Sequence, residues 1–245
     1  MIHARSGVGT GMQIDIWSDI ACPWCYIGKR RLETALADHP QRDEIEVTWH
    51  SYQLDPTLPE HYEGTEVEYL ASRKGMPVEQ VRQMFGHVTE QAAGEGLAYD
   101  FDTLVVANSA HAHELLHLAK ERGLADAVKE ALLSGHFEHG MDIGDVDQLV
   151  RVGVGAGLDE GEIRAALEDR RYQAAVASDI DMARQIGVTG VPFVVLDMKY
   201  AVSGAQPPEV FRQAIDTALA EQAPALQVVD GSSDAEACGP DGCAI

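Results

Sequence analysis

Basic residues are scarce in this 245-residue sequence, and long apolar runs are missing from it. Lys and Arg total 18 against 40 Asp and Glu, which gives a formal net charge of −22 at pH 7. Such an acidic surface repels nucleic acids and anionic membranes, so we expect neither as a partner. No window approaches the roughly 18 consecutive apolar residues of a membrane-spanning helix. Residues 1–11 lack the apolar core of a secretory signal, so we expect a flexible leader on a cytoplasmic protein.

Cysteine is also rare, and its four occurrences form two close pairs, Cys22 with Cys25 and Cys238 with Cys243. Cytoplasmic thiols are mostly kept reduced, so structural disulfides are unusual there. Two close pairs in that compartment therefore indicate redox or metal chemistry. The hydrophobic content of 45% is that of an ordinary globular protein with a sizeable core.

The first pair lies where a predicted strand meets a predicted helix. Residues 12–19 alternate apolar and polar side chains, and residues 25–37 repeat apolar side chains at helical spacing. Unpaired N–H groups and the dipole at a helix start stabilise a thiolate, and we expect Cys22 to benefit. Two intervening residues let the sulfurs of Cys22 and Cys25 reach bonding distance. A structural disulfide or half of a zinc site is the alternative.

The remaining pattern predicts an α/β protein with a large all-helical insertion. Residues 45–54 read as a second strand, which completes a βαβ unit. Residues 190–197 and 200–204 read as a hairpin, and 208–221 as a closing amphipathic helix. Between them, apolar residues recur at three- and four-residue spacing from about 65 to 184. The predicted helices there are 78–93, 107–122, 124–135, 145–155, 159–167 and 172–186.

Several motifs resemble the FrnE-type group of DsbA-like proteins in the thioredoxin superfamily. The opening match is Ser18-Asp-Ile-Ala-Cys-Pro-Trp-Cys-Tyr-Ile-Gly28, and the next most specific is Gly187-Val-Thr-Gly-Val-Pro-Phe193. Residues 108–115 and 137–143 match as well. Ser109 and Glu114 differ from the group's usual Thr and Arg. The resemblance covers the chain from Met12 to about Glu221.

This resemblance implies a thioredoxin-like fold made of residues 12–60 and 187–221, with 61–186 as the helical insertion. It implies a cis peptide bond between Val191 and Pro192, beside the Cys22 sulfur. Cys22 and Cys25 are then catalytic. The substrate is positioned by Pro23, Trp24, Val191 and Pro192, and His111 or His113 faces the cleft.

The implied activity is that of a thiol–disulfide oxidoreductase or isomerase acting on protein or peptide disulfides. No tightly bound cofactor is expected, and glutathione or thioredoxin would be the electron donor or acceptor. A glutathione-dependent 2-hydroxychromene-2-carboxylate isomerase shares the fold but typically has serine at the nucleophile position. An enzyme of polyketide biosynthesis is a second alternative. A metal-binding or holdase protein without enzyme activity is the third.

The second cysteine pair lies in the predicted tail, residues 222–245, with Gly-Pro-Asp-Gly turn residues between Cys238 and Cys243. A secondary redox pair that exchanges with the first, a regulatory lock and accidental oxidation are the three interpretations. We expect no metal site, because the one-turn pair His113 and His117 has no accompanying carboxylate motif. Positive charge near the first pair is expected from Lys29, Arg30 and Arg31.

Overall fold

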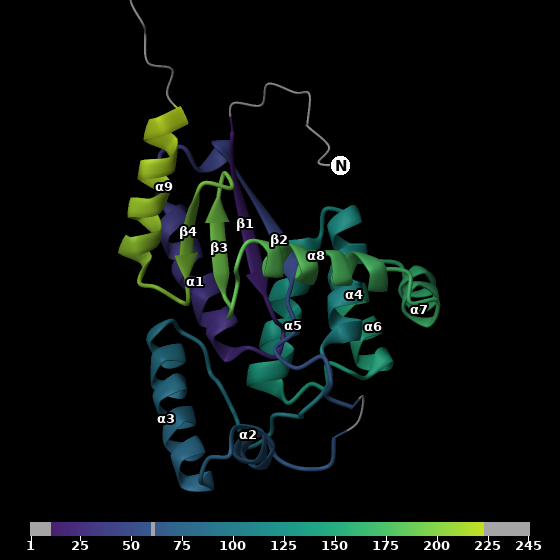
Figure 1. Cartoon of the computed structure of the whole chain (residues 1–245). Helices are drawn as coiled ribbons and strands as arrows, with labels where there is room; N and C mark the ends of the chain where they lie inside the picture. Colours follow the sequence, from purple (N-terminus) through teal and green to yellow (C-terminus); the bar gives the residue numbers. More distant parts are fainter. Residues whose placement is uncertain (1–10, 60–61, 223–245) are drawn as a thin grey trace, which may run out of the picture.

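The computed structural model describes residues 11–59 and 62–222, and its centre is a four-stranded mixed sheet (Figure 1). The strands are β1 (Met12–Ser18), β2 (Ile45–Ser51), β3 (Phe193–Leu196) and β4 (Tyr200–Ser203). Their order is β2-β1-β3-β4, with β1 parallel to β2 and antiparallel to β3. The α/β fold with a βαβ unit and a hairpin is therefore confirmed, although β2 and β3 are shorter than predicted.

The alternation in β1 sends its side chains to two different layers. Met12, Ile14 and Ile16 are buried in the main core, which α1 (Pro23–Ala37) and α9 (Pro208–Gln222) cover. Trp17 points to the opposite face and packs with Ala183 of α8 (Gln173–Gln185). The sheet is thus covered by helices on both faces, which is the arrangement seen in Figure 1.

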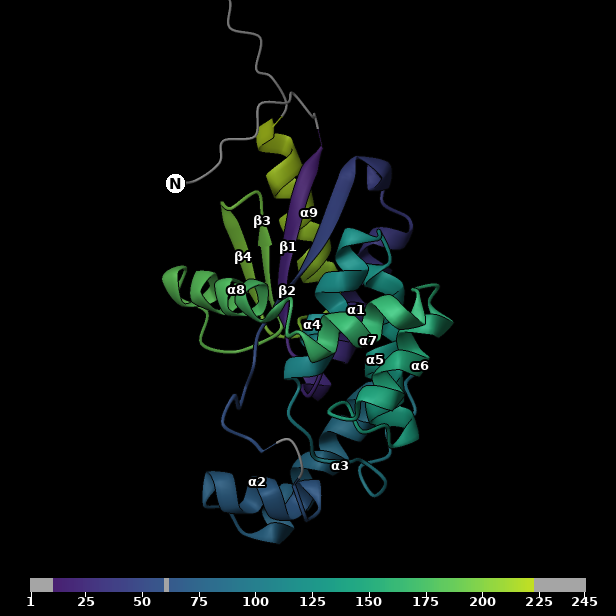
Figure 2. The same cartoon turned by 90° about the vertical axis from the view of Figure 1, so that its right-hand side faces the viewer.

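Among the described residues, seven helices, α2 to α8, lie between β2 and β3 in the sequence. Figure 2 shows α4, α5, α6 and α7 grouped beside the sheet, whereas α2 and α3 lie together below it. None of the helices among the described residues is long and apolar enough to cross a membrane. The remaining bounds are α2 Glu66–Lys74, α3 Val78–Gly94, α4 Ala110–Glu121, α5 Ala125–His139, α6 Val146–Gly155, α7 Glu160–Glu168 and a short 3-10 turn, Arg42–Glu44.

Two of these helices differ from the sequence prediction. Helix α5 continues past Gly135 to His139 and ends at Gly140, whose φ of 61° is left-handed. Gly135 is instead a packing residue, because a Cβ there would lie 2.7 Å from the Met141 sulfur. Helix α2 was not among the predicted helices, although Thr65 and Glu68 form a capping box at its start. The domain boundaries at 60 and 187 stay a prediction.

Candidate active site

Both cysteines of the first pair are buried thiols at the start of α1. Strand β1 ends at Ser18, a short turn follows, and Cys22 is the N-cap residue of the helix. The Cys22 side chain is 4% exposed and Cys25, one turn further, is 1% exposed. The Cys25 amide donates to the Cys22 carbonyl at 3.0 Å. Cys22 is thus the outer sulfur of the pair and Cys25 the inner one.

The loop before β3 meets the outer sulfur. The Val191–Pro192 peptide bond is cis, which confirms the expectation drawn from the resemblance. The Cys22 sulfur lies 3.5 Å from the Val191 carbonyl oxygen. Gly28 of α1 permits this approach, because a Cβ at that position would lie 2.8 Å from the Pro192 ring. Residues 169 positions apart in the sequence therefore form one site.

Pro23 and Trp24, the two residues between the cysteines, face the helical insertion. The hydroxyl of Tyr99 donates to the Pro23 carbonyl at 2.6 Å, which ties the start of α1 to the segment after α3. Trp24 is half-buried, with its ring 6.1 Å from that of His87. The structure thus brings together six of the eight predicted site residues. Cys238 and Cys243 lie outside the described residues.

A buried set of ionisable side chains lies behind the thiols. Asp19 accepts from the Leu54 amide at 2.7 Å and contacts His113 Nε2 at 3.1 Å. Of the two histidines expected at the cleft, His113 therefore reaches the site, and it is fully buried. Lys129 of α5 is also fully buried, and its ammonium has no hydrogen-bond partner among the described residues. It lies over the Trp49 ring, 5.4 Å from the ring centroid.

These neighbours change the acidity of the thiols. Burial lowers the pKa of Lys129 to about 8, against attraction from the two cysteines and Asp19. Burial opposes ionisation of Cys25, but the Cys22 side chain and the Lys129 charge outweigh it and lower the pKa of Cys25. The Cys25 sulfur, together with burial, raises the pKa of Cys22. The pair therefore shares one negative charge, which passes to Cys22 when the proton moves to Cys25.

The two thiols titrate as one coupled pair, so the expectation that Cys22 holds the thiolate stays a prediction. The helix start gives Cys22 no side-chain cap hydrogen bond. The groups that favour a thiolate lie around the inner sulfur instead: Ser18, the Asp19 backbone and Lys129. Lys129 occupies a buried helix position, with Leu133 and Phe137 following at four-residue spacing. A lysine at such a position was a signal that the sequence analysis missed.

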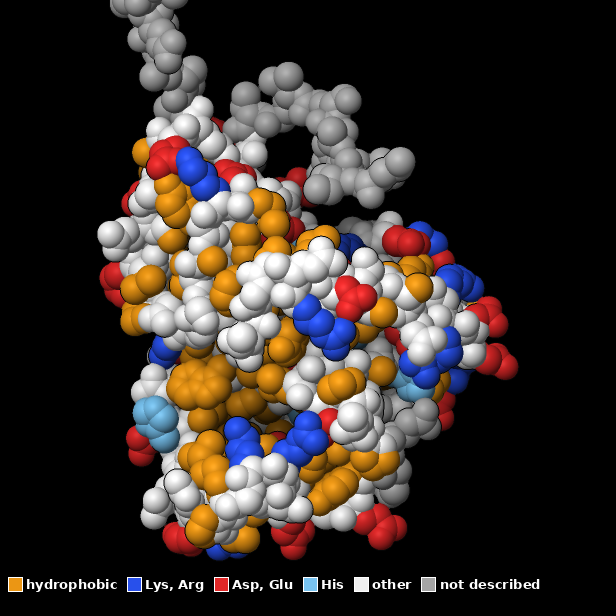
Figure 3. Space-filling model, in the orientation of Figure 1, with side chains coloured by type: hydrophobic (Ala, Val, Ile, Leu, Met, Phe, Trp, Pro, Cys, Tyr) orange, Lys and Arg blue, Asp and Glu red, His pale blue; other side chains and the backbone are white. Residues whose placement is uncertain are grey.

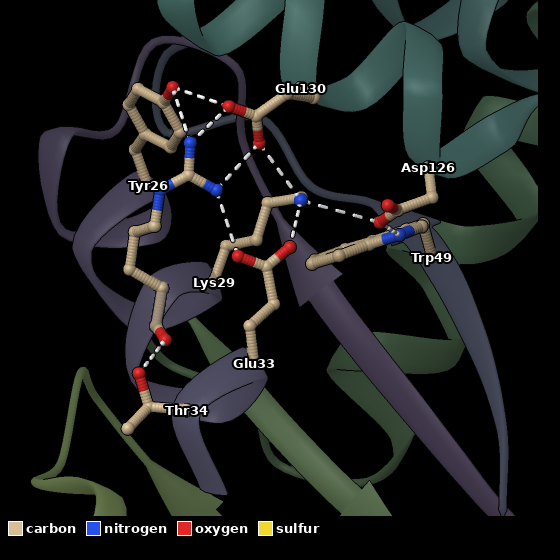
Figure 4. Close-up of polar contacts among 8 residues, drawn as sticks. Tyr26, Lys29, Glu33, Thr34, Trp49, Asp126 and Glu130 are labelled. Atoms are coloured by element: carbon tan, nitrogen blue, oxygen red, sulfur yellow. Dashed lines mark hydrogen bonds and ion pairs between the residues drawn. The ribbon is translucent and has the colours of Figure 1, made fainter. Parts of the chain in front are cut away.

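The basic residues of α1 were expected to place positive charge near the thiols. They bring no net positive charge there, because acidic partners neutralise them. Lys29 contacts Glu33 and lies 2.9 Å from Glu130 of α5, and Arg30 pairs with the same two carboxylates (Figure 4). Arg31 pairs with Glu95 at 2.6 Å. These ion pairs tie α1 to α3 and α5. They hold α1 in position and supply no net positive charge to the cysteine pair.

A cavity of about 450 Å³ opens beside Cys22. Its wall is mainly apolar and comes from the start of α1 and from α2, α3 and the segment before α4. Figure 3 shows a hollow lined with hydrophobic side chains and with basic side chains at its edge. The basic residues lining the cavity are Arg73 and Lys74 of α2. Neither was predicted, since α2 itself was not.

A second cavity, of about 310 Å³, lies beside α4 and α8. His111 lines this cavity and not the one beside Cys22. Glu114 lines it as well, and Glu114 accepts from Arg170 at 2.7 Å. Within residues 11–59 and 62–222, no group of three or more His, Cys, Asp or Glu side chains is arranged to hold a metal ion. His117, one turn from His113, contacts Asp179 at 3.1 Å.

Comparison with known proteins places this geometry among thioredoxin-like proteins. The model of the DSBA-like thioredoxin domain matches residues 13–216. The structure of a probable DsbA oxidoreductase from Streptomyces coelicolor is 47% identical, with a TM-score of 0.83, and covers 96% of this chain and 99% of its own. The uncharacterized protein YwbO of Bacillus subtilis is 27% identical over 83% of this chain and 96% of its own length.

More distant structures share the fold alone. The cytosolic disulfide reductase DsbM from Pseudomonas aeruginosa, in a structure with GSH, is 19% identical with a TM-score of 0.60, and covers 85% of this chain and 99% of its own. A 2-hydroxychromene-2-carboxylate isomerase is 15% identical, also with a TM-score of 0.60, and covers 86% of this chain and 98% of its own. The fold is therefore common to disulfide chemistry and to this isomerisation, so the site residues must decide between them.

Proposed function

Since the chain belongs to the DSBA-like thioredoxin domain family, we propose that it is a thiol–disulfide oxidoreductase acting on protein or peptide disulfides through Cys22 and Cys25. One observation carries the proposal. Cys22 lines an apolar cavity, and its sulfur lies beside the Val191 carbonyl, while Cys25 is 1% exposed and does not line the cavity. An accessible nucleophile with a buried partner one turn away is what disulfide exchange requires.

The reaction proceeds in two exchange steps. The Cys22 thiolate attacks one sulfur of the substrate disulfide, the S–S bond breaks, and the other substrate sulfur leaves as a thiolate that takes up a proton. Cys25, deprotonated, then attacks the Cys22 sulfur of the mixed disulfide and releases the second substrate thiol. The substrate gains two electrons and two protons, which the cysteine pair loses. Run in reverse, the same steps oxidise a substrate dithiol.

The residues around the pair have positioning roles in this proposal. The Val191 backbone, beside the Cys22 sulfur, is where an extended peptide would pair, as strands are added at a sheet edge. Pro192 fixes the course of that backbone beside Cys22. Pro23 and Trp24 form part of the cavity wall on the other side of the sulfur. The complete Cys-Pro-Trp-Cys sequence favours disulfide exchange over the isomerase activity that shares this fold.

We further propose a cytoplasmic enzyme of the FrnE-type group that exchanges electrons with glutathione or thioredoxin. The fold shared with a disulfide reductase named as cytosolic is consistent with this compartment. A titration of the Cys22–Cys25 pair against glutathione buffers would give its reduction potential, and so its direction in the cell.

Substitution of each cysteine tests the proposal. Cys22→Ser should abolish reduction of a protein disulfide such as that of insulin, because the attacking sulfur is lost. Cys25→Ser should instead accumulate a mixed disulfide on Cys22, visible by mass as the protein plus the substrate thiol. The matched control is the double variant Cys238→Ser/Cys243→Ser, which keeps the first pair. Full turnover by Cys22→Ser would disprove the mechanism.

The tail cysteines are proposed as a secondary redox pair that exchanges with the first. The proposal rests on the sequence alone, in which Cys238 and Cys243 flank turn residues. Mass mapping of trapped thiols across a glutathione titration should show the Cys238–Cys243 disulfide following the Cys22–Cys25 disulfide. In Cys22→Ser the tail pair should then oxidise more slowly. A tail pair that oxidises at the same rate in both proteins would indicate accidental oxidation.

A further inference from the structure

One face of α2 forms a wall of the cavity beside Cys22. The residues of this face follow helical spacing, at i, i+3, i+4, i+7 and i+8: Glu66, Tyr69, Leu70, Arg73 and Lys74. The helix is therefore aligned along the cavity, with its N-terminal carboxylate and its two C-terminal cations on the same side. These end groups are separated by seven or eight residues, about 10 to 12 Å along the axis.

Most of the remaining wall is aromatic or aliphatic. Trp24 lies next to Cys22, and the other apolar side chains of the wall come from α3, α5 and the segments that precede α2 and α4. They include Leu58, Phe85, Val88, Phe101, Val106 and Phe137. A cavity of about 450 Å³ with such a lining suits an apolar group the size of one or two rings, next to the reacting sulfur. The polar groups at its end then decide which apolar groups are accepted.

The two cations are unusual on this molecule, which has only 18 basic residues against 40 acidic ones. The Arg73 guanidinium contacts Asp55 at 3.1 Å, and Asp55 also accepts from the Tyr69 hydroxyl at 2.7 Å. Lys74 makes no ion pair with any of the residues described. Asp19 and Asp55 also line the cavity, and Asp55 is the partner of Arg73, so the local positive charge available to an anion is mainly that of Lys74 at the C-terminal end of α2.

Glu66 marks the other end of this wall. Burial raises the pKa of its carboxyl to about 7, so it is partly neutral near neutral pH and repels an anion less than an exposed carboxylate would. It lies about two helical turns from Arg73 and Lys74. The wall therefore has a definite polarity: the C-terminal end of α2 favours an anionic group and the N-terminal end does not.

We propose that the cavity gives the enzyme a preference for disulfides whose flanking group is apolar and carries a carboxylate, with Arg73 and Lys74 binding the carboxylate. The inference rests on the proposed function, because it assigns specificity to the same site. The carboxylate can belong to a small disulfide or to an acidic residue or C-terminus beside a cystine in a peptide. The exchange chemistry is unchanged: the Cys22 sulfur forms the new S–S bond and the other substrate sulfur leaves as the thiolate.

Two aromatic disulfides that differ in charge test this preference. The probe 5,5′-dithiobis(2-nitrobenzoate) carries a carboxylate on each ring, whereas 4,4′-dithiodipyridine is neutral at pH 7, and both release a coloured thiol. The single-turnover rate of the reduced Cys25→Ser/Cys238→Ser/Cys243→Ser protein would be measured with each. For each variant, the rate with the anionic probe is divided by the rate with the neutral probe, and this ratio is compared with that of the background protein. The difference in intrinsic reactivity between the two probes then cancels.

Lys74→Gln should lower this rate ratio roughly fivefold to tenfold, as expected for the loss of one local charge. Lys74→Arg should restore it. Arg73→Gln should lower it as well, but part of its effect comes through Asp55 and Tyr69. The matched control is Lys199→Gln, the same charge change on a 60%-exposed side chain in the β3–β4 turn, which should leave the ratio unchanged. Added salt should reduce the preference of the background protein.

A second comparison distinguishes a preference for small disulfides from a preference for peptide disulfides. Two cystine peptides of equal length, one with an acidic residue beside an aromatic one and one with its amide counterpart, would be compared in the same variants. Loss of preference with both the small probe and the peptide supports recognition of the carboxylate itself, and loss with only one identifies the source. Equal loss with the neutral and anionic probes, or no change in Lys74→Gln, would overturn the inference. If neither probe labels Cys22 at all, the proposed function fails instead.

Discussion

Lys129 is the residue that most directly links the redox state of the pair to the protein around it. Its ammonium is fully buried above the Trp49 ring, and the charges that stabilise it are Asp19 and the thiolate of the cysteine pair. A buried charge without a partner is costly, so its stabilisation depends on those anions. Formation of the Cys22–Cys25 disulfide removes the thiolate. Lys129 therefore favours the reduced form over the oxidised form.

Lys129→Met keeps the length of the side chain and removes the charge. The pKa of the first thiol to ionise should rise by about 1 or more, because an opposite charge nearby has been lost. The disulfide should also become less oxidising, since the reduced pair loses its stabilising cation. The thiolate absorbance near 240 nm against pH, with a glutathione titration, would measure both. The control is Lys199→Met on the exposed β3–β4 turn, and equal curves for the two variants would contradict this role.

At the scale of elements, the site depends on how closely α1 approaches the loop before β3. Gly28 is the point of closest approach, where an added Cβ would be 2.8 Å from Pro192 and 3.5 Å from Ala205. The same helix is held from its other sides by the Lys29, Arg30 and Arg31 ion pairs. Because α1 cannot move away freely, an extra methyl must displace the Pro192 loop.

Gly28→Ala should therefore destabilise the protein by about 1 to 3 kcal/mol, as overpacking does, and slow disulfide exchange. Gly86→Ala is the matched control in α3, where an added Cβ meets no atom within 4 Å. There the change should stabilise by about 0.5 to 1 kcal/mol, since alanine favours a helix interior more than glycine does. Urea unfolding gives both values, and a Gly28→Ala protein as stable and active as the original would contradict the close contact.

At the scale of the whole molecule, a network around His50 joins the sheet to α8. The two ring nitrogens of His50 lie 2.7 Å from Asp15 and 3.0 Å from Asp179, and the Ser51 amide donates to Asp179 at 2.8 Å. Burial disfavours the cation, but the two carboxylates outweigh it and raise the pKa of His50 above 6.5. Burial likewise opposes the ionised Asp179, yet its histidine partners lower the pKa of Asp179 below 3.8.

The two shifts predict a window of greatest stability. The contribution of His50 is complete below about pH 6.5 and is lost as pH rises through its higher folded pKa. The contribution of Asp179 is complete above about pH 3.8 and is lost as pH falls through its lower folded pKa. The network therefore stabilises the fold most between these two values.

Asp179→Asn should reduce the free energy of unfolding at pH 5.5 by about 1.5 to 3 kcal/mol, the range for hydrogen bonds to charged groups. The fall in stability between pH 5.5 and pH 8.5 should also be smaller than in the original protein. The control is Asp181→Asn, an exposed carboxylate on the same helix paired with Arg184. The free energy of unfolding would be measured with urea at both pH values for the original protein and the two variants. An equal pH dependence of stability in all three would rule out the His50 network as the source of that dependence.

The features that could be predicted from the sequence are those that local patterns of residues determine. The strand-to-helix position of Cys22 and the proline at 192 are local patterns, and the structure brings the two together. The cations of α2 and the burial of Lys129 depend on where the insertion packs against α1, which no local period encodes. The influence of Ser18 and Lys129 on the thiols was not predicted for the same reason, since both act on Cys25 through space.

The three tryptophans are placed very differently around this site. Trp17 is stacked on His50 with its ring nitrogen donating to the Asp179 carbonyl, and Trp49 lies under Lys129, so both are closed off from solvent. Trp24 alone is half-buried and lines the cavity next to Cys22. An emission change upon filling that cavity would therefore come chiefly from one indole. The protein has a built-in optical reporter at the position where its chemistry is proposed to occur.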